Sequence, residues 1–587
     1  MHPLTSRPWT RLGSSLSLKR LVPPLAVAVV SAAATSTPAS TLQLIPLYWQ
    51  GTYGEWQNEG RAITPDGAFV VGGEYASNTV FNAWMDGIFY DVTNHSVVVP
   101  TSSGMAAAIL TGIGYRSDGG QKQTVLDGLS GQQANWMTTD GGATWGAKRR
   151  NASWTAGKNL PIANSLAAAI GSSTFYAVIG DNPTDVNTQR NIYICQGSNT
   201  WNSTTAPAFI QKAHNIGNPD AGHFTGVAAT GRAVGWYRDA YSDAGNRHNY
   251  VVNWPPPAAG YYTNTWQFRG LDGSYRGEAW SVSPDGNKIF GRSPVTTDTN
   301  WHGYKAVVVA GTTNLQGINP LPDFSNTGGG QYLACPYGCS ADGRYAVGMN
   351  YRGVERAVIW DTGDANPANW TVVDLTDVAS AEGLLGVAPN PRWAGLTRAY
   401  SVGTNAAGEP VVTGYGYYYD GTTWYNRGFV MTVSKCSLVA NACAFASPVY
   451  DTATTVTVTN CNPAATAINI YHDGSLMGSG AGGSATVVVT VAPPSLVAGW
   501  VLSVTQTVNG QESCLHNAPS TIVTTPANPP PVVALTSPTN NASFVAPAII
   551  GLAATVTSNY NVIDFVSFYN FFTNLIASVT TPPYAYT

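Results

Sequence analysis

The chain has 587 residues, of which only 10% are charged, whereas an average soluble domain has about a quarter. Glycine, proline and aromatic residues are abundant, with 62 Gly, 37 Pro, 30 Tyr, 18 Trp and 16 Phe. This composition excludes coiled coils and charged disordered chains, and the lack of a basic run argues against nucleic acid as a partner. We therefore predict a large all-β protein that is rich in turns.

Residues 1–40 have the pattern of a secretory signal peptide. An apolar stretch at 21–34 and a run of small residues follow a basic start that contains Arg7, Arg11, Lys19 and Arg20. The apolar stretch is shorter than the ~20 residues of a membrane-spanning helix. Cleavage after residue 34 would remove four positive charges and no acid, so the net charge would change from −4 to −8. We expect a secreted or cell-surface protein with no membrane span after cleavage; a retained anchor is the alternative.

A repeated pattern covers residues 41–435. A strand, a Ser/Thr-Pro-Asp-Gly-like turn and a second strand ending in Gly recur, most clearly at 62–73, 281–293 and 338–350. With the turn as landmark there are seven copies, 52 to 65 residues apart, at Asp66, Asp118, Ser172, Thr230, Asp285, Asp342 and Ala407. Three landmarks are followed after 18 residues by a tryptophan, at Trp84, Trp136 and Trp360. This spacing predicts one buried aromatic side chain in the third strand of each unit.

These units predict a seven-bladed β-propeller at 41–435. Each unit reads as four antiparallel strands, and the Gly of the turn supplies the positive φ of a tight hairpin. The seventh unit offers only three strands and ends at 428–433, so we expect the N-terminal segment 41–48 to supply its outer strand. Such a closure removes an exposed sheet edge.

The unit S-x-D-G-x-x-x-V-G, followed by a strand with an aromatic residue, resembles the HAF repeat of bacterial extracellular proteins over roughly 60–433. In addition, Thr138 to Trp145 resemble the Asp-box S/T-x-D-x-G-x-T-W of sialidase-like and xyloglucanase-like propellers. The first resemblance implies secretion and a propeller. The second implies a hairpin turn remote from catalysis, in which Asp140 caps backbone N–H groups and Trp145 packs between blades.

From Cys436 onward the sequence consists of short strands rich in Val and Thr. Residues 436–524 resemble a bacterial Ig-like domain, and a Pro-rich linker follows at 525–531. Residues 532–587 resemble a second such module, which stops where further strands are expected. We therefore predict two Ig-like β-sandwich modules after the propeller, the last apparently truncated. The alternative is that its free edge accepts a strand from a neighbouring molecule.

The seven cysteines fit an oxidising compartment. Spacing does not fix their pairing, but it suggests the disulfides Cys335–Cys339, Cys436–Cys443 and Cys461–Cys514, with Cys195 left over. We predict no metal site, because Cys335-x3-Cys339 lacks a second pair of ligands. We also predict no cofactor, because no P-loop, dinucleotide-binding fingerprint, HExxH or EF-hand motif is present.

Loops between the second and third strands of units 4 to 7 carry an excess of aromatic and arginine residues. Aromatic rings stack on the apolar faces of sugars, and arginine binds hydroxyl or carboxylate groups, so these loops suit a neutral or acidic glycan. The candidate ligand-binding residues are Tyr241, Arg247, Trp301, Tyr351, Arg352, Tyr417, Tyr419, Trp424, Tyr425 and Arg427. For any single ring, packing between blades is the alternative.

The predicted function is recognition of an extracellular polysaccharide or another cell-surface component. One alternative is a polysaccharide lyase or glycoside hydrolase with Ig-like spacers. A lyase needs a cation and a His or Tyr for proton transfer, and a glycosidase needs two carboxyl groups. The candidate catalytic residues are His248, Tyr250, Arg276, Glu278, His302 and Tyr304. A structural adhesin is the second alternative.

Overall fold

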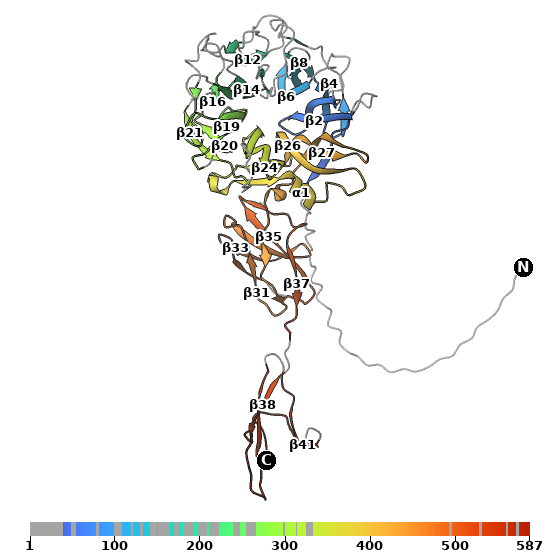
Figure 1. Ribbon diagram of the computed structural model, residues 1–587, viewed down its shortest axis with the longest axis vertical. Coiled ribbons are helices and arrows are strands. Elements are labelled where there is room, and N and C mark those ends of the chain that lie inside the picture. Colours follow the sequence, from blue (N-terminus) through green and yellow to red (C-terminus); the bar gives the residue numbers. More distant parts are fainter. Residues whose placement is uncertain are drawn as a thin grey trace, which may run out of the picture. The chain divides into compact units, whose positions relative to one another are not determined.

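The protein is all-β, as predicted. In the part of the chain that the structure describes, the only α-helix is α1 (Leu375–Ala381), and no helix there is long and apolar enough to cross a bilayer. The computed structural model (Figure 1) describes residues 39–47, 55–77, 82–98, 109–118, 121–129, 133–140, 149–150, 165–168, 175–179, 192–197, 208–210, 222–238, 247–253, 266–297, 300–310, 312, 314–324, 333–491, 496–527, 531–558, 562–570 and 574–587. Residues 1–38 of the predicted signal peptide therefore lie outside the described residues.

Seven four-stranded antiparallel sheets occupy the repeat region in the described part of the chain. Six of them follow chain order: β2–β5 (Glu55–Ile63, Phe69–Ser77, Asn82–Asp91, Ser96–Val98), β6–β9 (Ile109–Asp118, Gln121–Leu129, Gln133–Thr138, Arg149–Arg150), β10–β13 (Ser165–Ala168, Phe175–Ile179, Ile192–Gly197, Ala208–Ile210), β14–β17 (Gly222–Val227, Ala233–Arg238, Arg247–Val252, Trp266–Gln267), β18–β21 (Glu278–Val282, Lys288–Pro294, Trp301–Val308, Leu315–Pro320) and β22–β25 (Ala334–Cys339, Tyr345–Tyr351, Glu355–Asp361, Thr371–Asp374).

The seventh sheet combines both ends of the repeat region. Its first three strands are β26 (Arg392–Thr404), β27 (Pro410–Tyr419) and β28 (Trp424–Thr432), and β1 (Thr41–Leu44) pairs with β28 as the fourth. The prediction that the N-terminal segment supplies the missing outer strand is confirmed.

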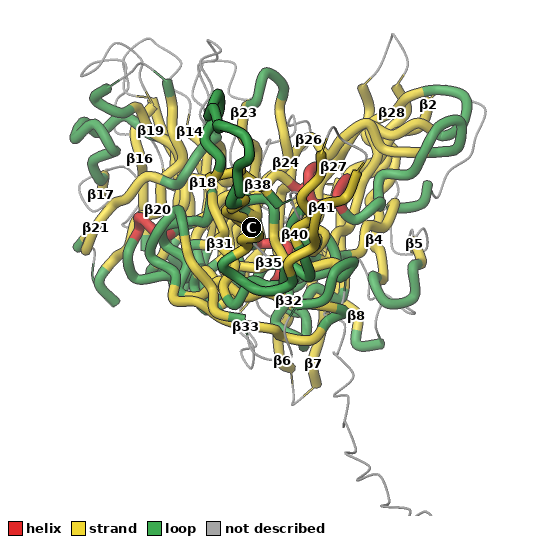
Figure 2. Tube along the Cα trace, turned by 90° about the horizontal axis from the view of Figure 1, so that it is seen from below, coloured by secondary structure: helices red, strands yellow, loops and turns green. Residues whose placement is uncertain are grey.

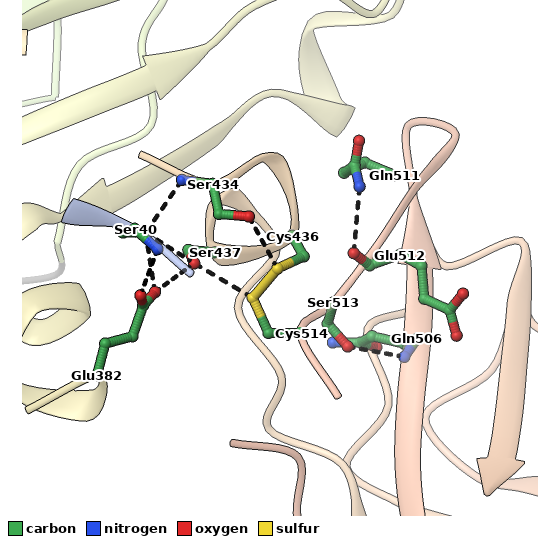
Figure 3. The surroundings of a disulfide bond; sticks show 10 residues. All are labelled: Ser40, Glu382, Ser434, Cys436, Ser437, Gln506, Gln511, Glu512, Ser513 and Cys514. Carbon is green, nitrogen blue, oxygen red and sulfur yellow. Dashed lines mark hydrogen bonds between the residues drawn. A yellow bond between two sulfur atoms is a disulfide. The ribbon is translucent and has the colours of Figure 1, made fainter. Parts of the chain in front are cut away.

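Ser40 fixes the start of β1. Its backbone N–H and its hydroxyl donate to the two carboxylate oxygens of Glu382, over 2.6 and 2.9 Å, and its hydroxyl accepts from the Ser434 N–H at 3.0 Å (Figure 3). The predicted cleavage after residue 34 would retain these contacts.

Neighbouring sheets pack through their first strands. β2 contacts β6, and the contacts continue through β10, β14, β18, β22 and β26 back to β2 (Figure 1). β2 also lies beside β28 of the last sheet (Figure 2). Apolar side chains fill this last junction, where Ile45, Val70 and Tyr90 share a core with Val411 and Val430. The seven sheets therefore form a closed cycle.

The Asp-Gly turns have the predicted geometry. Gly67, Gly286 and Gly343 have φ values of 73°, 75° and 62°, in the region that favours glycine. In the fifth sheet, Asp285 accepts from the Ser283 hydroxyl at 2.5 Å and from the Asn287 N–H at 3.0 Å. The turn acids therefore hold the hairpin backbone. In the predicted Asp-box, Thr138 donates to Asp140 over 2.6 Å, and residues 141–148 lie outside the described part.

The prediction of a buried aromatic residue in the third strand is confirmed in the five sheets whose third-strand side chains the structure describes, at Tyr90, Tyr250, Tyr304, Trp360 and Phe429. Its position within the strand, however, differs among the sheets. The repeated glycine of the second strand gives a common reference point. The second-strand residue two positions before this glycine pairs with an aromatic third-strand residue in three sheets, at Tyr90, Trp136 and Trp360. In three other sheets its third-strand partner is not aromatic: Val252, Ala306 and Met431. Trp84 pairs instead with Tyr75, six residues before Tyr90. Its spacing from Asp66 matched by coincidence, because the loop between the second and third strands differs in length among the sheets.

Residues 444–524 form two sheets over one core. The first contains β29 (Ala444–Phe445), β31 (Thr455–Thr459) and β34 (Val487–Thr490); the second contains β30 (Val449–Tyr450), β32 (Ala467–His472), β33 (Ser475–Ala481), β35 (Val501–Val508), β36 (Gln511–Glu512) and β37 (Ser520–Thr524). Val458 and Val489 of the first sheet pack with Ile468, Leu502 and Val504 of the second. This arrangement is a β-sandwich.

Residues 532–587 form a three-stranded sheet and a hairpin. The sheet contains β38 (Val532–Ser537), β39 (Leu552–Thr557) and β42 (Tyr584–Tyr586), and the hairpin contains β40 (Val566–Asn570) and β41 (Asn574–Val579). Ala554, Val566 and Phe568 form a small core between them.

The structure corrects the predicted disulfides of the β-sandwich. Cys436 is bonded to Cys514 (Figure 3), whereas Cys443 and Cys461 are free thiols with their sulfur atoms 3.5 Å apart. The predicted pairs Cys436–Cys443 and Cys461–Cys514 are wrong because the short 3-10 helix 435–438 packs beside β36, which ends two residues before Cys514. Packing between segments that are distant in the sequence therefore decides the disulfide partner of Cys436.

The predicted disulfide Cys335–Cys339 is also wrong. Both thiols are free, and both residues lie on β22. Four residues of extended strand span about 13 Å, and a disulfide joins Cα atoms less than about 7 Å apart. The remaining cysteine, Cys195, lies on β12 and pairs with Ala177 in the sheet.

Candidate functional site

A β-bulge recurs near the middle of the first strand in six of the seven sheets. The extra residue lies between the pairs Gly60/Ala62, Leu110/Gly112, Phe224/Gly226, Ala279/Ser281, Pro336/Gly338 and Ala399/Ser401. A bulge turns the side chain of the unpaired residue in a new direction. We call these residues the bulge residues: Arg61, Thr111, Thr225, Trp280, Tyr337 and Tyr400.

The glycine that ends the second-strand motif makes room for the bulge. A Cβ atom on Gly72 would lie 1.9 Å from the carbonyl oxygen of Glu59. On Gly291, Gly348 and Gly414 a Cβ would lie 2.3, 1.9 and 1.9 Å from the carbonyl oxygen that stands two residues before the bulge residue. The repeated Val-Gly of the sequence is therefore required by the bulge of the neighbouring strand.

Gly348→Ala is expected to lower the free energy of unfolding by about 1–3 kcal/mol, as overpacking typically does. The added methyl group would overlap the Cys335 carbonyl oxygen, so the bulge that carries Tyr337 must shift. Urea denaturation of the purified variant measures the loss. Gly317→Ala is the matched control, because the only atom near its added Cβ lies 3.9 Å away. Equal stability of the two variants would refute the role assigned to the repeated glycine.

The six bulge residues line a single cavity. It encloses about 370 Å³, and its walls come from β2, β6, β14, β18, β22 and β26. The lining runs along each first strand from the bulge toward the Asp-Gly turn. A cavity of this size falls within the range of small-molecule sites. Arg61 and Arg398 are the charged residues among its described lining.

Three neighbouring bulge residues form an aromatic wall in this cavity. The rings of Trp280 and Tyr337 are nearly perpendicular with centroids 5.2 Å apart, and the Tyr337 and Tyr400 centroids are 5.6 Å apart. Burial raises the pKa of both tyrosine hydroxyls above the ordinary value. At neutral pH both phenols are therefore uncharged and can donate hydrogen bonds. The wall offers apolar ring faces together with hydroxyl groups.

Each cavity arginine is held by a carboxylate that stands outside the lining. Arg398 donates from Nε and Nη2 to the two oxygens of Glu355, both over 2.6 Å. Arg61 donates to Glu59 over 2.5 Å, and its guanidinium lies 4.5 Å from the centre of the Tyr400 ring. Burial raises the pKa of Glu59, and the opposing charge of Arg61 only partly offsets this shift. The carboxylates orient the guanidinium groups.

Glu278, a predicted catalytic candidate, is completely buried and binds three side chains. One oxygen accepts from Arg292 Nε at 2.7 Å and from the Trp280 indole N–H at 3.1 Å, and the other pairs with Arg247. Arg247 in turn lies 4.2 Å from the centre of the Trp236 ring. These contacts place Glu278 behind the aromatic wall, where it orients Trp280.

The other catalytic candidates do not converge on the cavity. His248 and Tyr250 are buried on β16, and His248 forms an isolated β-bridge with Arg276. The hydroxyl of Tyr304, also buried, donates to the Asn249 side chain over 2.6 Å. His302 lies two residues before Tyr304 on β20, and its Nδ1 lies 2.6 Å from Oδ2 of Asp323.

Several predicted ligand-binding residues make contacts within the fold. Arg352 pairs with Asp374 at 3.3 Å and with Asp377 at 2.6 Å. Arg427 is buried and donates to the Ile45 carbonyl at 3.2 Å, in the junction between the last and first sheets. The remaining positions are Trp301, 5.9 Å from the Arg292 guanidinium, Tyr351, half-buried at the end of β23, and Tyr241, outside the described residues.

The predicted aromatic residues of the β27–β28 hairpin do gather on one surface. Tyr417 stacks on Trp424 with centroids 5.3 Å apart and an angle of 14°, and Tyr419 lies 5.0 Å from Trp424. The Arg392 guanidinium lies 4.7 and 5.2 Å from the Tyr419 and Trp424 rings. We call these four residues the hairpin platform. Tyr417 is 46% exposed, whereas Tyr425 pairs with Tyr418 and therefore belongs to the opposite face of the hairpin.

One group of side chains in the described part has the spacing of metal ligands: Cys436, Cys514 and His516. The two sulfur atoms form the disulfide, so neither is the thiolate that a metal ion would need.

Reasoning from the sequence missed the cavity, although a signal for it was present. Four bulge residues stand five positions before the turn landmark of their repeat: Arg61, Thr225, Trp280 and Tyr337. The offset alone could have marked them as equivalent. Regular alternation along a strand does not reveal the direction of their side chains, because the bulge interrupts it.

One family model matches the end of the chain. Residues 531–587 match the family model described as bacterial Ig domain. A search of curated proteins found no match. Similar solved structures include the catalytic domain of the GH62 α-L-arabinofuranosidase of Coprinopsis cinerea, with 13% identity, 46% of this chain and 96% of that chain covered, and a TM-score of 0.25.

Two further similar structures cover more of this chain. Sqt1 of Chaetomium thermophilum, bound to the N-terminus of ribosomal protein L10, has 12% identity, coverage of 74% of this chain and 97% of that chain, and a TM-score of 0.32. Prolyl oligopeptidase B of Galerina marginata has 9% identity, coverage of 73% and 53%, and a TM-score of 0.30. Scores this low carry no argument about the function of this chain.

Proposed function

We propose that the chain is a secreted or cell-surface protein that recognises an extracellular polysaccharide or another surface component. The observation that carries this proposal is the hairpin platform. Its stacked rings, Tyr417 and Trp424, are accompanied by the guanidinium of Arg392. Flat aromatic faces pack against the C–H faces of sugar rings, and arginine donates to hydroxyl and carboxylate oxygens.

We further propose that residues 41–435 are a seven-bladed β-propeller built from HAF-like repeats. The closed cycle of seven four-stranded sheets, the cavity between their first strands and the outer strand supplied by β1 support this architecture. The Ig-like modules at 436–524 and 532–587, joined by the linker 525–531, would act as spacers. The bacterial Ig match supports an extracellular location, as does the predicted signal peptide.

The positions of the catalytic candidates favour binding over catalysis. Both oxygens of Glu278 are engaged by arginine and tryptophan side chains, and His302 lies beside Asp323 away from the described lining of the cavity. A lyase or glycosidase needs its catalytic acid and base side by side at the substrate bond that is cleaved. None of the catalytic candidates is among the described residues that line the cavity.

Trp424→Ala is expected to weaken polysaccharide binding at least about tenfold, the loss typical of a central aromatic contact. Retardation in gels that contain neutral or uronate-rich polysaccharides measures the affinity. Tyr425→Ala, on the opposite face of the same hairpin, should bind like the unmodified protein. The hairpin platform would be ruled out if Trp424→Ala kept full retardation or if Tyr425→Ala lost as much. Release of reducing ends or unsaturated uronates from any polysaccharide would refute a purely binding role.

A further inference from the structure

The described charged side chains that line the cavity are arginines. The full chain has a net charge of −4, yet the charged residues among the described lining are Arg61 and Arg398. Their partners, Glu59 and Glu355, stand outside the lining. A guanidinium has five N–H donors, and the Glu355 pair uses two of those on Arg398. Each arginine charge is balanced by its glutamate, but Arg398 keeps N–H donors that a ligand in the cavity could use.

A hydroxyl group in the cavity also lacks a partner among the described residues. Thr111 is 7% exposed, lines the cavity as a bulge residue, and its Oγ1 makes no hydrogen bond in that part of the chain. Burying a hydroxyl group without a hydrogen-bond partner costs free energy. An oxygen atom of a ligand would accept the missing hydrogen bond.

The aromatic wall connects the cavity with the hairpin platform. Tyr400 lies 5.9 Å from Tyr415 of β27. Tyr415, Tyr417 and Tyr419 alternate along β27, which pairs with β28 without a bulge, so their side chains share one face. Ring contacts therefore run from Trp280 in the cavity to Tyr415, which lies on the same face of β27 as Tyr417 of the platform.

We propose that the cavity is a second carbohydrate site, which takes a sugar that bears a carboxylate, of the uronate class. The carboxylate binds Arg398 and Arg61, the sugar ring packs on Tyr337 and Trp280, and a sugar oxygen accepts from Thr111. This inference rests on the proposed recognition of a polysaccharide and names its acidic sugar. A cavity of about 370 Å³ accommodates a single sugar unit of a chain whose other units cross the platform.

The test compares two probe sugars that differ by the carboxylate. Galacturonate and galactose are titrated into the full chain by calorimetry, and galacturonate is expected to bind at least about tenfold more tightly, as a charge-assisted pair predicts. Arg398→Gln should abolish this preference, and Arg398→Lys should restore part of it. Glu355 is about a third exposed, so the loss of its partner is tolerated. Arg392→Gln, on the platform, is the control and should keep the preference.

The cavity proposal is overturned if the unmodified protein binds the two sugars equally or binds neither, or if Arg398→Gln keeps the preference. Its failure is distinguishable from failure of the proposed function. Trp424→Ala should leave galacturonate binding unchanged, because a single sugar reaches the cavity without the platform. If galacturonate is preferred while Trp424→Ala leaves polysaccharide binding intact, the platform fails and the cavity stands. If galacturonate is not preferred while Trp424→Ala weakens polysaccharide binding, the cavity proposal fails and the platform stands.

Discussion

Glu278→Gln is expected to lower the free energy of unfolding by about 3 kcal/mol, the cost of breaking a buried ion pair from one side. Glu278 is completely buried, and its partner Arg292 is nearly so. The substitution keeps the size of the side chain but removes its charge, which leaves the Arg292 guanidinium buried among the rings of Trp280 and Trp301. Urea denaturation followed by tryptophan fluorescence measures the loss.

Asp377→Asn is the matched control for this substitution. It also removes the charge of a carboxylate paired with arginine, Arg352, at 2.6 Å, but Asp377 is 64% exposed. Exposed pairs contribute about 0–1 kcal/mol, so this variant should be nearly as stable as the unmodified protein. Similar losses in the two variants would show that burial does not set the cost, contrary to the role given to Glu278.

Cys514→Ser is expected to destabilise the β-sandwich by about 4 kcal/mol. The disulfide with Cys436 closes a loop of 78 residues, and the entropy that such a loop regains in the unfolded chain accounts for a loss of this size. The loop contains almost all strands of the two sheets, so the effect should be confined to their unfolding transition. Thermal unfolding monitored by calorimetry measures it.

Two comparisons isolate the disulfide from the loss of a thiol. The double variant Cys436→Ser/Cys514→Ser should be no less stable than Cys514→Ser, because the bond is already absent. A reducing agent should destabilise the unmodified protein and leave the double variant unchanged. A double variant that responds to reduction as strongly as the unmodified protein would mean that another bond supplies the stability.

The bulge explains how one framework carries a chemically varied cavity. The bulge residue has no direct partner in its sheet, so its side chain can change without altering the strand pairing. In this chain the position holds arginine, threonine, tryptophan or tyrosine, from Arg61 in the first sheet to Tyr400 in the last. What the framework does require is the neighbouring glycine, such as Gly348, because any side chain there would overlap a carbonyl oxygen.

The all-β class, the turns and the closing strand could be predicted because they depend on local signals. An Asp-Gly pair such as Asp285-Gly286 forms a tight turn whatever surrounds it, since the positive φ of glycine and the Asp hydrogen bonds act within a few residues. The last unit has only three strands in the sequence, which was sufficient to assign the segment at Thr41 to it as the fourth. The gathering of aromatic residues at Tyr417 and Trp424 followed from their places in one hairpin.

Only the tertiary structure decided the features that depend on contacts between distant segments. The partner of Cys436 is set by the packing of β36, 75 residues further on at Gln511, and not by the nearer Cys443. The cavity exists because six bulges on six sheets point to one place, and neither the bulge nor the meeting of the sheets is a property of a single strand. Residues at the same distance from the turn in different repeats are equivalent in sequence. Their side chains share a site only because the sheets close into a cycle.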